Sequence, residues 1–323
     1  MRERFIYADG RISGLGTTLL DDRMWQMLVL AEDGEDLLRF LGDTWYGRFM
    51  QQRSLDECFE QAMSVTEDEL IELSEDRRLV EGILQRRDVR NARYLWKDAL
   101  LRGAAETIPL ERSGLVPTSL LSRAVQEDQA RDEMPRLFTA AIEEILAIEH
   151  PTEAAIDARM DVLAVTVETS TLPAVDASLA RFVMDRVEQR NYLTAARSRL
   201  AGLPRQDTEA MLQAGGRHSP AEVAEAWQRG ALQESLAESA GFEAAAAALG
   251  EALGGDGFNA YSRECERHLL SLLDAGALPV FGPAPLAAFL LQREMEIMHL
   301  RIIAAAKAAG VPAMRLQDRL PRG

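Results

Sequence analysis

Two carboxylate–amide pairs have the residue types and spacing that chemistry would need. Asp88 stands three residues before Asn91, and Glu188 stands three residues before Asn191. On an α-helix this spacing puts both side chains of a pair on one face. Such a pair can serve acid–base chemistry or bind a metal ion, but a buried acid beside an amide more often bridges to a neighbouring helix. We favour the structural interpretation. The candidate partners that lie nearest in sequence are Arg90 and Arg190.

Metal binding and covalent catalysis find little support elsewhere in the sequence. The four histidines show no paired spacing of the H-E-x-x-H kind, which argues against a zinc site. Cys265 and His268 lie one helical turn apart, but two ligands are weak evidence for a metal. GLGTTLL matches neither a phosphate-binding loop nor a dinucleotide motif, and no serine lies in G-x-S-x-G. We therefore expect no catalytic, cofactor-binding or metal-binding residue. The histidines are His150, His218, His268 and His299.

The elements that must position the two pairs are copies of one long helix. Residues 79–103 recur as 179–202 and, in weaker form, as 286–310. Matches held at one fixed offset indicate an internal repeat. In the third copy, this register places Met295 and Met298 where the first two copies carry the acid and the amide. The identical pairs in the first two copies are Leu79/Leu179, Arg86/Arg186, Arg90/Arg190 and Asn91/Asn191.

The repeat predicts three helical parts, which we place at residues 1–110, 111–214 and 215–323. Hydrophobic residues make up 47% of the chain, and its many Leu, Ala, Glu and Arg residues favour helix over strand. The expected fold class is therefore all-α. The segment VLAVTVETSTL, residues 162–172, is locally β-like because of its branched residues. We still expect a helix there, ended by Pro173, because the corresponding part of the first third is helical in pattern.

Other residues carry structural expectations. Ser54 followed by Glu57 predicts the capped start of a long helix. Trp96 is expected in the core, whereas Trp45 and Tyr46 suit an interface anchor and the core equally well. The third repeat helix carries an apolar stripe that we expect neighbouring helices to cover. Its members are Leu291, Met295, Met298, Ile302 and Ala305.

Charge and composition limit the partners. The formal net charge of -16 argues against direct binding to nucleic acid or to an anionic lipid surface, and favours a protein or cationic partner. The two cysteines, Cys58 and Cys265, lie far apart, and no signal-like start precedes them, so we expect a reducing, cytoplasmic compartment. No apolar run approaches the roughly 20 residues of a membrane helix.

Several segments, in their order and spacing, resemble the C-type subunits of V-type ATPases and ATP synthases, a family whose eukaryotic vacuolar member carries the letter d. The matching pieces are Tyr7–Leu20, LLRFLGDTWYGRFM, the two carboxylate–amide helices, the Gly215–Gly216 loop and the closing helix with Glu294 and Glu296. No piece is specific by itself, and residues 103–173 match only in helical pattern.

The resemblance implies an all-helical funnel of three similar parts with pseudo-threefold symmetry. It also implies a non-catalytic role as the central-stalk rotor socket of a rotary ATPase that transports protons or sodium ions. The implied partners are the shaft subunits of the ATP-hydrolysing head and the proteolipid ring of the membrane sector. The protein would then lie at the cytoplasmic face of a membrane complex, without inserting into the membrane.

Two other interpretations are compatible with the sequence. A free-standing helical-repeat adaptor would bind an unrelated protein. However, solenoid repeats have units of roughly 30 to 45 residues, shorter than the three parts predicted here. A helical, metal-dependent enzyme would depend on Cys265 and His268 alone.

Overall fold

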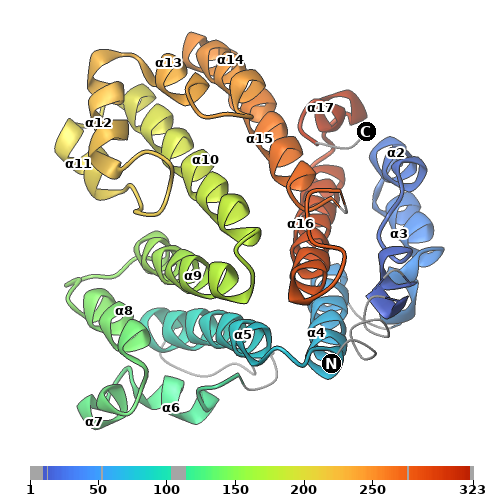
Figure 1. Ribbon diagram of the computed structural model, residues 1–323, viewed down its shortest axis with the longest axis horizontal. Helices are drawn as coiled ribbons and strands as arrows, with labels where there is room; N and C mark the ends of the chain where they lie inside the picture. The colour runs from blue at the N-terminus through green and yellow to red at the C-terminus, as the bar shows by residue number, and fades with distance from the viewer. Residues whose placement is uncertain (1–9, 13, 52–53, 103–113, 275, 321–323) are drawn as a thin grey trace. The chain divides into compact units, whose positions relative to one another are not determined.

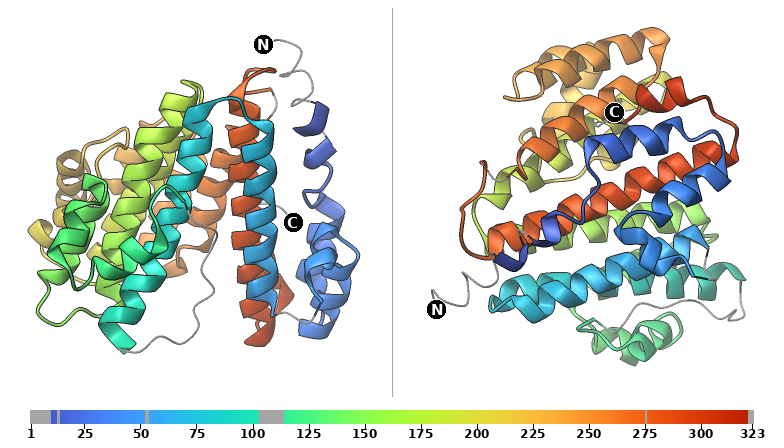
Figure 2. Two further views of the ribbon diagram at one scale, coloured as in Figure 1. Left: turned by 90° about the horizontal axis from the view of Figure 1, so that it is seen from below. Right: turned by 90° about the vertical axis from the view of Figure 1, so that its right-hand side faces the viewer.

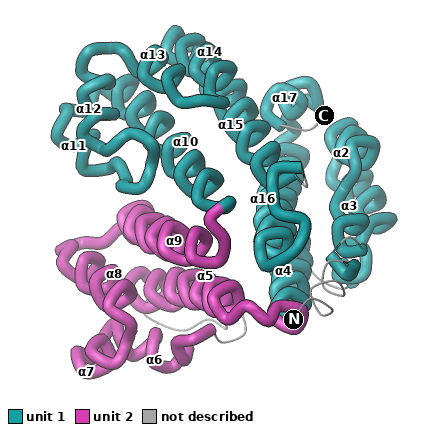
Figure 3. The backbone as a smooth tube through the Cα atoms, viewed as in Figure 1, with its two compact units in different colours: residues 1–70, 178–323 teal, residues 71–177 magenta. Residues whose placement is uncertain are grey.

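The computed structural model describes residues 10–12, 14–51, 54–102, 114–274 and 276–320. Every regular element in these ranges is a helix (Figure 1), which confirms the all-α prediction. The chain divides into two compact units (Figure 3). Unit 2 is Ile71–Ala177, and unit 1 combines Met1–Leu70 with Ser178–Gly323. The predicted division into three parts, with its threefold symmetry, stays a prediction.

Unit 2 is built on two long helices, α5 and α9, which pack side by side (Figure 1). Ion pairs connect them along their length. Arg86 pairs with Glu168 at 3.0 Å, and Lys97 pairs with Asp157 at 3.0 Å. The helices of this unit are α5 (Arg77–Lys97), the π-helical turn η2 (Asp98–Arg102), α6 (Thr118–Arg123), α7 (Asp128–Asp132), α8 (Arg136–Leu146) and α9 (Glu153–Val175).

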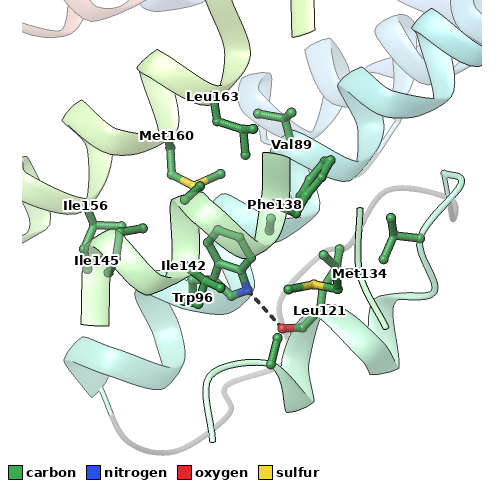
Figure 4. Packing of buried hydrophobic residues seen from close by; sticks show 14 of the residues in the cluster. Val89, Trp96, Leu121, Met134, Phe138, Ile142, Ile145, Ile156, Met160 and Leu163 are labelled. Carbon is green, nitrogen blue, oxygen red and sulfur yellow. Dashed lines mark hydrogen bonds between the residues drawn. The ribbon is translucent and has the colours of Figure 1, made fainter. Parts of the chain in front are cut away.

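The hydrophobic core of unit 2 surrounds Trp96, near the end of α5 (Figure 4). The indole is fully buried, and its Nε1–H donates a hydrogen bond of 2.9 Å to the carbonyl of Leu121 in α6. A buried indole needs such a partner, because an unpaired N–H would lose its bond to water without replacement. Trp96 therefore lies in the core, as predicted, and joins α6 to α5.

The β-like segment of α9 is helical, as predicted. Its hydroxyls are satisfied within the helix, where Thr171 Oγ1 donates to the carbonyl of Val167 at 2.7 Å. Back-bonding of this kind lets Ser and Thr sit in a helix interior. The prediction that Pro173 ends the helix is wrong, because α9 continues to Val175. So close to the helix end, proline removes only one intrahelical hydrogen bond.

Unit 1 contains the remaining helices and a core of its own around Tyr192, Phe242 and Tyr261. The capping box predicted at the start of α4 is confirmed: Ser54 N–H donates to Glu57 Oε2 at 2.8 Å, and Glu57 N–H donates to Ser54 Oγ at 3.3 Å. The elements are α2 (Asp22–Leu30), α3 (Gly34–Gly42), the 3₁₀ turn η1 (Trp45–Phe49), α4 (Leu55–Leu73, which ends in unit 2), α10 (Leu179–Leu200), α11 (Arg205–Ala210), α12 (Pro220–Arg229), α13 (Leu232–Ala237), α14 (Glu243–Glu251), the π-helical turn η3 (Ala252–Asp256), α15 (Asn259–Ser271), α16 (Pro283–Ala308) and α17 (Ala313–Gln317).

The 26-residue helix α16 lies beside α2 and α3 (Figure 2). Near its end, Lys307 Nζ donates to the carbonyls of Val29 and Ala31, at 2.7 and 2.5 Å. These carbonyls belong to the C-terminal end of α2, where a cation is favoured by the helix dipole. The ammonium thus fixes the end of α2 onto α16.

The predicted apolar stripe of α16 is only partly buried. Met298 is 39% exposed, and Ala305 is also exposed. The buried side of the helix instead includes Glu296, His299 and Lys307. Each of these polar groups has a hydrogen-bonding partner, which offsets the cost of removing it from water.

We expect Trp96→Ala to lower the free energy of unfolding by about 3–5 kcal/mol, because it empties a filled core position. Trp96→Phe keeps most of the ring but leaves the Leu121 carbonyl without its donor, which should cost about 1–3 kcal/mol. Leu137→Ala, at a 42% exposed site of the same unit, is the control and should change little. Urea unfolding followed by circular dichroism measures all three, and equal losses would contradict this packing.

Candidate functional site

The first predicted acid, Asp88, binds backbone amides. Its carboxylate is fully buried and accepts hydrogen bonds from the N–H groups of Leu115 at 2.9 Å and Val116 at 3.1 Å. These residues directly precede α6. The approach is so close that a Cβ at Gly114 would lie 2.2 Å from Asp88 Oδ1. The prediction that Arg90 is the partner is therefore wrong.

Burial raises the pKa of Asp88 to about 6, even though the hydrogen bonds from Val116, Leu115 and Gly114 act in the opposite direction. These opposing contributions come from backbone amides. The charged form is therefore more costly here than in water, and the amides compensate for only part of that cost.

The second predicted acid, Glu188, repeats this arrangement in α10. Its buried carboxylate accepts from the N–H groups of Arg217 at 2.9 Å and His218 at 3.1 Å, just before α12. His218 Nδ1 lies 2.5 Å from the same carboxylate, and Ser239 Oγ donates to it at 3.1 Å. A Cβ at Gly216 would approach Glu188 Oε2 to 2.7 Å. Arg190 is therefore not its partner either.

Asn191 assists Glu188 by binding the same loop. Its Nδ2 donates to the carbonyl of Gln213 at 2.7 Å, and its Oδ1 accepts from the N–H of Gln213 at 2.9 Å. The i, i+3 pair on α10 therefore does meet one segment, as its spacing predicted. The ligand is the backbone of residues 213–218, so the pair has a structural role.

The neighbouring acid Asp185 explains the position of His268. Its fully buried carboxylate accepts two hydrogen bonds from the Arg217 guanidinium, at 2.6 and 2.8 Å, and lies 2.8 Å from His268 Nε2. Burial alone would raise the pKa of Asp185, but hydrogen bonds with His268 and Arg217 outweigh it and lower the pKa. His268 is thus engaged with an acid rather than with Cys265.

Cys265 is also unsuited to metal binding or nucleophilic attack. Its thiol is fully buried in the core of unit 1, and burial raises its pKa to about 12. A thiol that stays protonated at neutral pH is a poor nucleophile and a poor metal ligand. Among the described residues, no group of three or more His, Cys, Asp or Glu is placed to hold a metal ion.

The third long helix, α16, carries a buried acid that the repeat register missed. Glu296 accepts hydrogen bonds from the N–H of Leu20 at 2.6 Å, from the Tyr46 hydroxyl at 2.6 Å and from Arg293 Nη1 at 2.5 Å. Burial raises its pKa, although Arg293 and the other donors oppose this. The acid is therefore Glu296 and not position 295, and its spacing to His299 is the signal that would have found it.

The aromatic pair beside Glu296 belongs to this cluster. Tyr46 is fully buried, and the Arg293 guanidinium stacks on the Trp45 ring with 4.2 Å between the guanidinium carbon and the ring centroid. Of the two interpretations offered for the pair, the structure places Tyr46 in the core. Burial and the adjacent Glu296 raise the pKa of the Tyr46 hydroxyl, so it remains a donor at neutral pH.

The remaining histidines have separate surroundings. His299 Nε2 lies 2.9 Å from Glu266, which Arg319 also contacts at 2.9 Å, so α15, α16 and the end of the chain are joined. His150 is exposed. The predicted candidates therefore divide among separate structural clusters, and none forms a group of converging acids, bases and nucleophiles.

These buried acids define a class of all-helical protein in which charged groups hold segments of the chain itself. The chain matches the family model described as ATP synthase (C/AC39) subunit over residues 8–319. The chain belongs to this family, which confirms the resemblance seen in the sequence, and its role lies in the V-type rotary complex. A search of curated proteins finds no match. In the described ranges, none of the helices has the length and apolar character needed to span a membrane.

The raised pKa of Asp88 makes unit 2 sensitive to pH. Below pH 3.8 the carboxyl is neutral in both the folded and the unfolded chain; as the pH rises towards 6 and beyond, the unfolded chain ionises more readily. The stabilising contribution of the neutral carboxyl is therefore lost on raising the pH, by an amount on the order of 3 kcal/mol.

Asp88→Asn tests this effect. We expect the free energy of unfolding of the unsubstituted protein, minus that of the variant, to decrease between pH 4 and about pH 7. Urea titrations across this range measure the difference. A difference that stays constant or increases with pH would contradict the account.

Proposed function

We propose that this chain is the central-stalk rotor socket of a V-type ATPase or ATP synthase. In this role it connects the shaft of the ATP-hydrolysing head to the membrane proteolipid ring and carries no catalytic group of its own. The family match over residues 8–319 is the observation that supports the proposal most strongly. The chemistry of the buried acids is consistent with it, because they bind the chain rather than a substrate.

A socket must transmit torque without yielding internally. Moving one elementary charge against a membrane potential of 100 mV requires about 2.3 kcal/mol. The connections between shaft and ring must withstand several times that energy. Glu188 and Glu296 favour stiffness, because a displaced segment would leave a buried carboxylate without its donors, which is costly.

The negative charge suits association with proteins rather than lipid. At -16, the chain is repelled by anionic headgroups and attracted to basic surfaces. We propose that basic segments of the shaft or of the ring loops provide the complementary surface. The transported ion, proton or sodium, would be selected by the membrane sector.

Affinity purification from membranes tests the assignment directly. A tagged form of the chain, isolated from mild-detergent extracts of its own cells, should bring with it a proteolipid and a coiled-coil shaft protein. Extracts carrying the tag alone are the control. Recovery of an unrelated soluble partner, with neither of these proteins, would contradict the proposal and favour the adaptor interpretation.

Association of the isolated chain with the rotor should weaken as salt increases. Screening shortens the range of charge attraction from about 10 Å at 0.1 M to about 3 Å at 1 M ionic strength. Binding measured across this range should show a rising dissociation constant, with circular dichroism as the control that the fold persists. An affinity that does not respond to salt would count against charge-driven docking.

A further inference from the structure

We infer that Gly16–Asp21 close the helical unit of α16 by the same carboxylate clasp with which α5 and α10 hold the segments before α6 and α12. A carboxylate clasp here means a buried acid on a long helix that accepts a hydrogen bond from the backbone N–H just before another helix. This inference concerns the architecture of the chain and does not depend on the proposed function.

The three acids share the same setting on their helices. In each case the acid is followed three residues later by a second buried polar residue, on the same face of the helix. The sequence repeat identified the first two pairs, but the third is displaced by one position from the register of the leucines. The three pairs are Asp88/Asn91, Glu188/Asn191 and Glu296/His299.

The three amides share the same setting in their segments. Val116 precedes Pro117, the N-cap residue of α6, and His218 precedes Ser219, the N-cap residue of α12. Leu20 precedes Asp21, which is the N-cap residue of α2. Each clasp therefore fixes the point at which the chain enters the next helix, and the geometry is defined by the position of the amide rather than by residue type.

The order along the chain distinguishes the third clasp. Val116 follows Asp88 by 28 residues, and His218 follows Glu188 by 30 residues. Leu20 precedes Glu296 by 276 residues. The segment that should follow α16 is thus supplied from the beginning of the described chain, and α2 takes the place that α6 and α12 take in the other two.

A second side chain on the helix strengthens two of the clasps. Arg293, three residues before Glu296, donates to the carbonyl and the hydroxyl of Thr18, at 3.3 and 2.5 Å. Asp185, three residues before Glu188, binds the side chain of Arg217. The same helical position therefore reaches the held segment in both cases, although the signs of the charges are reversed.

Hydrogen exchange of the whole chain tests this equivalence. Glu296→Gln should speed exchange in the peptide that contains Leu20 by about tenfold or more, since it replaces a charged acceptor. Peptides containing Val116 and His218 should be unaffected. Glu188→Gln should act only on the His218 segment, and Asp88→Asn only on the Val116 segment.

Two further variants keep the test decisive. Glu296→Asp retains the carboxylate, as Asp88 does naturally, and should restore part of the protection around Leu20. Glu225→Gln, at an exposed position of α12, is the control and should change none of the three segments. The inference is overturned if the Leu20 segment exchanges freely in the unsubstituted protein, or if Glu296→Gln leaves its exchange unchanged or alters all three segments alike.

Discussion

The structure depends on burying carboxylates that must each be satisfied by the chain itself. Asp88, Glu188 and Glu296 are removed from water on long helices, where an unpaired charge would be strongly destabilising. Backbone N–H groups of three entering segments supply the required donors. Each segment in turn obtains a partner for an amide that lies outside any helix. The need to pair buried charge thus determines where three helices begin.

Much of the fold was predictable because it follows from local rules. Helical composition, the Ser54 capping box and the burial of Trp96 are encoded in neighbouring residues, and the β-branched stretch of α9 is helical because its hydroxyls bond within the helix. Asp88 and Glu188 were correctly singled out by their repeat and their spacing. Their ligands were not predictable, because backbone amides carry no residue signature.

The errors have specific physical causes. Arg90 and Arg190 were chosen as partners because side-chain charge is visible in a sequence, whereas the entering loops are not. Glu296 was missed because the leucines of α16 are displaced by one position relative to its acid, so the repeat register pointed to Met295. The contact between Leu20 and Glu296 joins residues 276 positions apart, a separation at which sequence spacing has no predictive value.

The central claim is that these carboxylates bind the backbone N–H groups of the entering segments, and NMR couplings across hydrogen bonds measure this most directly. The account predicts couplings between the amide nitrogen of Leu20 and the side-chain carboxyl carbon of Glu296, and likewise for Val116 with Asp88 and for Arg217 with Glu188. Absence of these couplings, with the three amides exchanging at the rates of exposed loops, would contradict it.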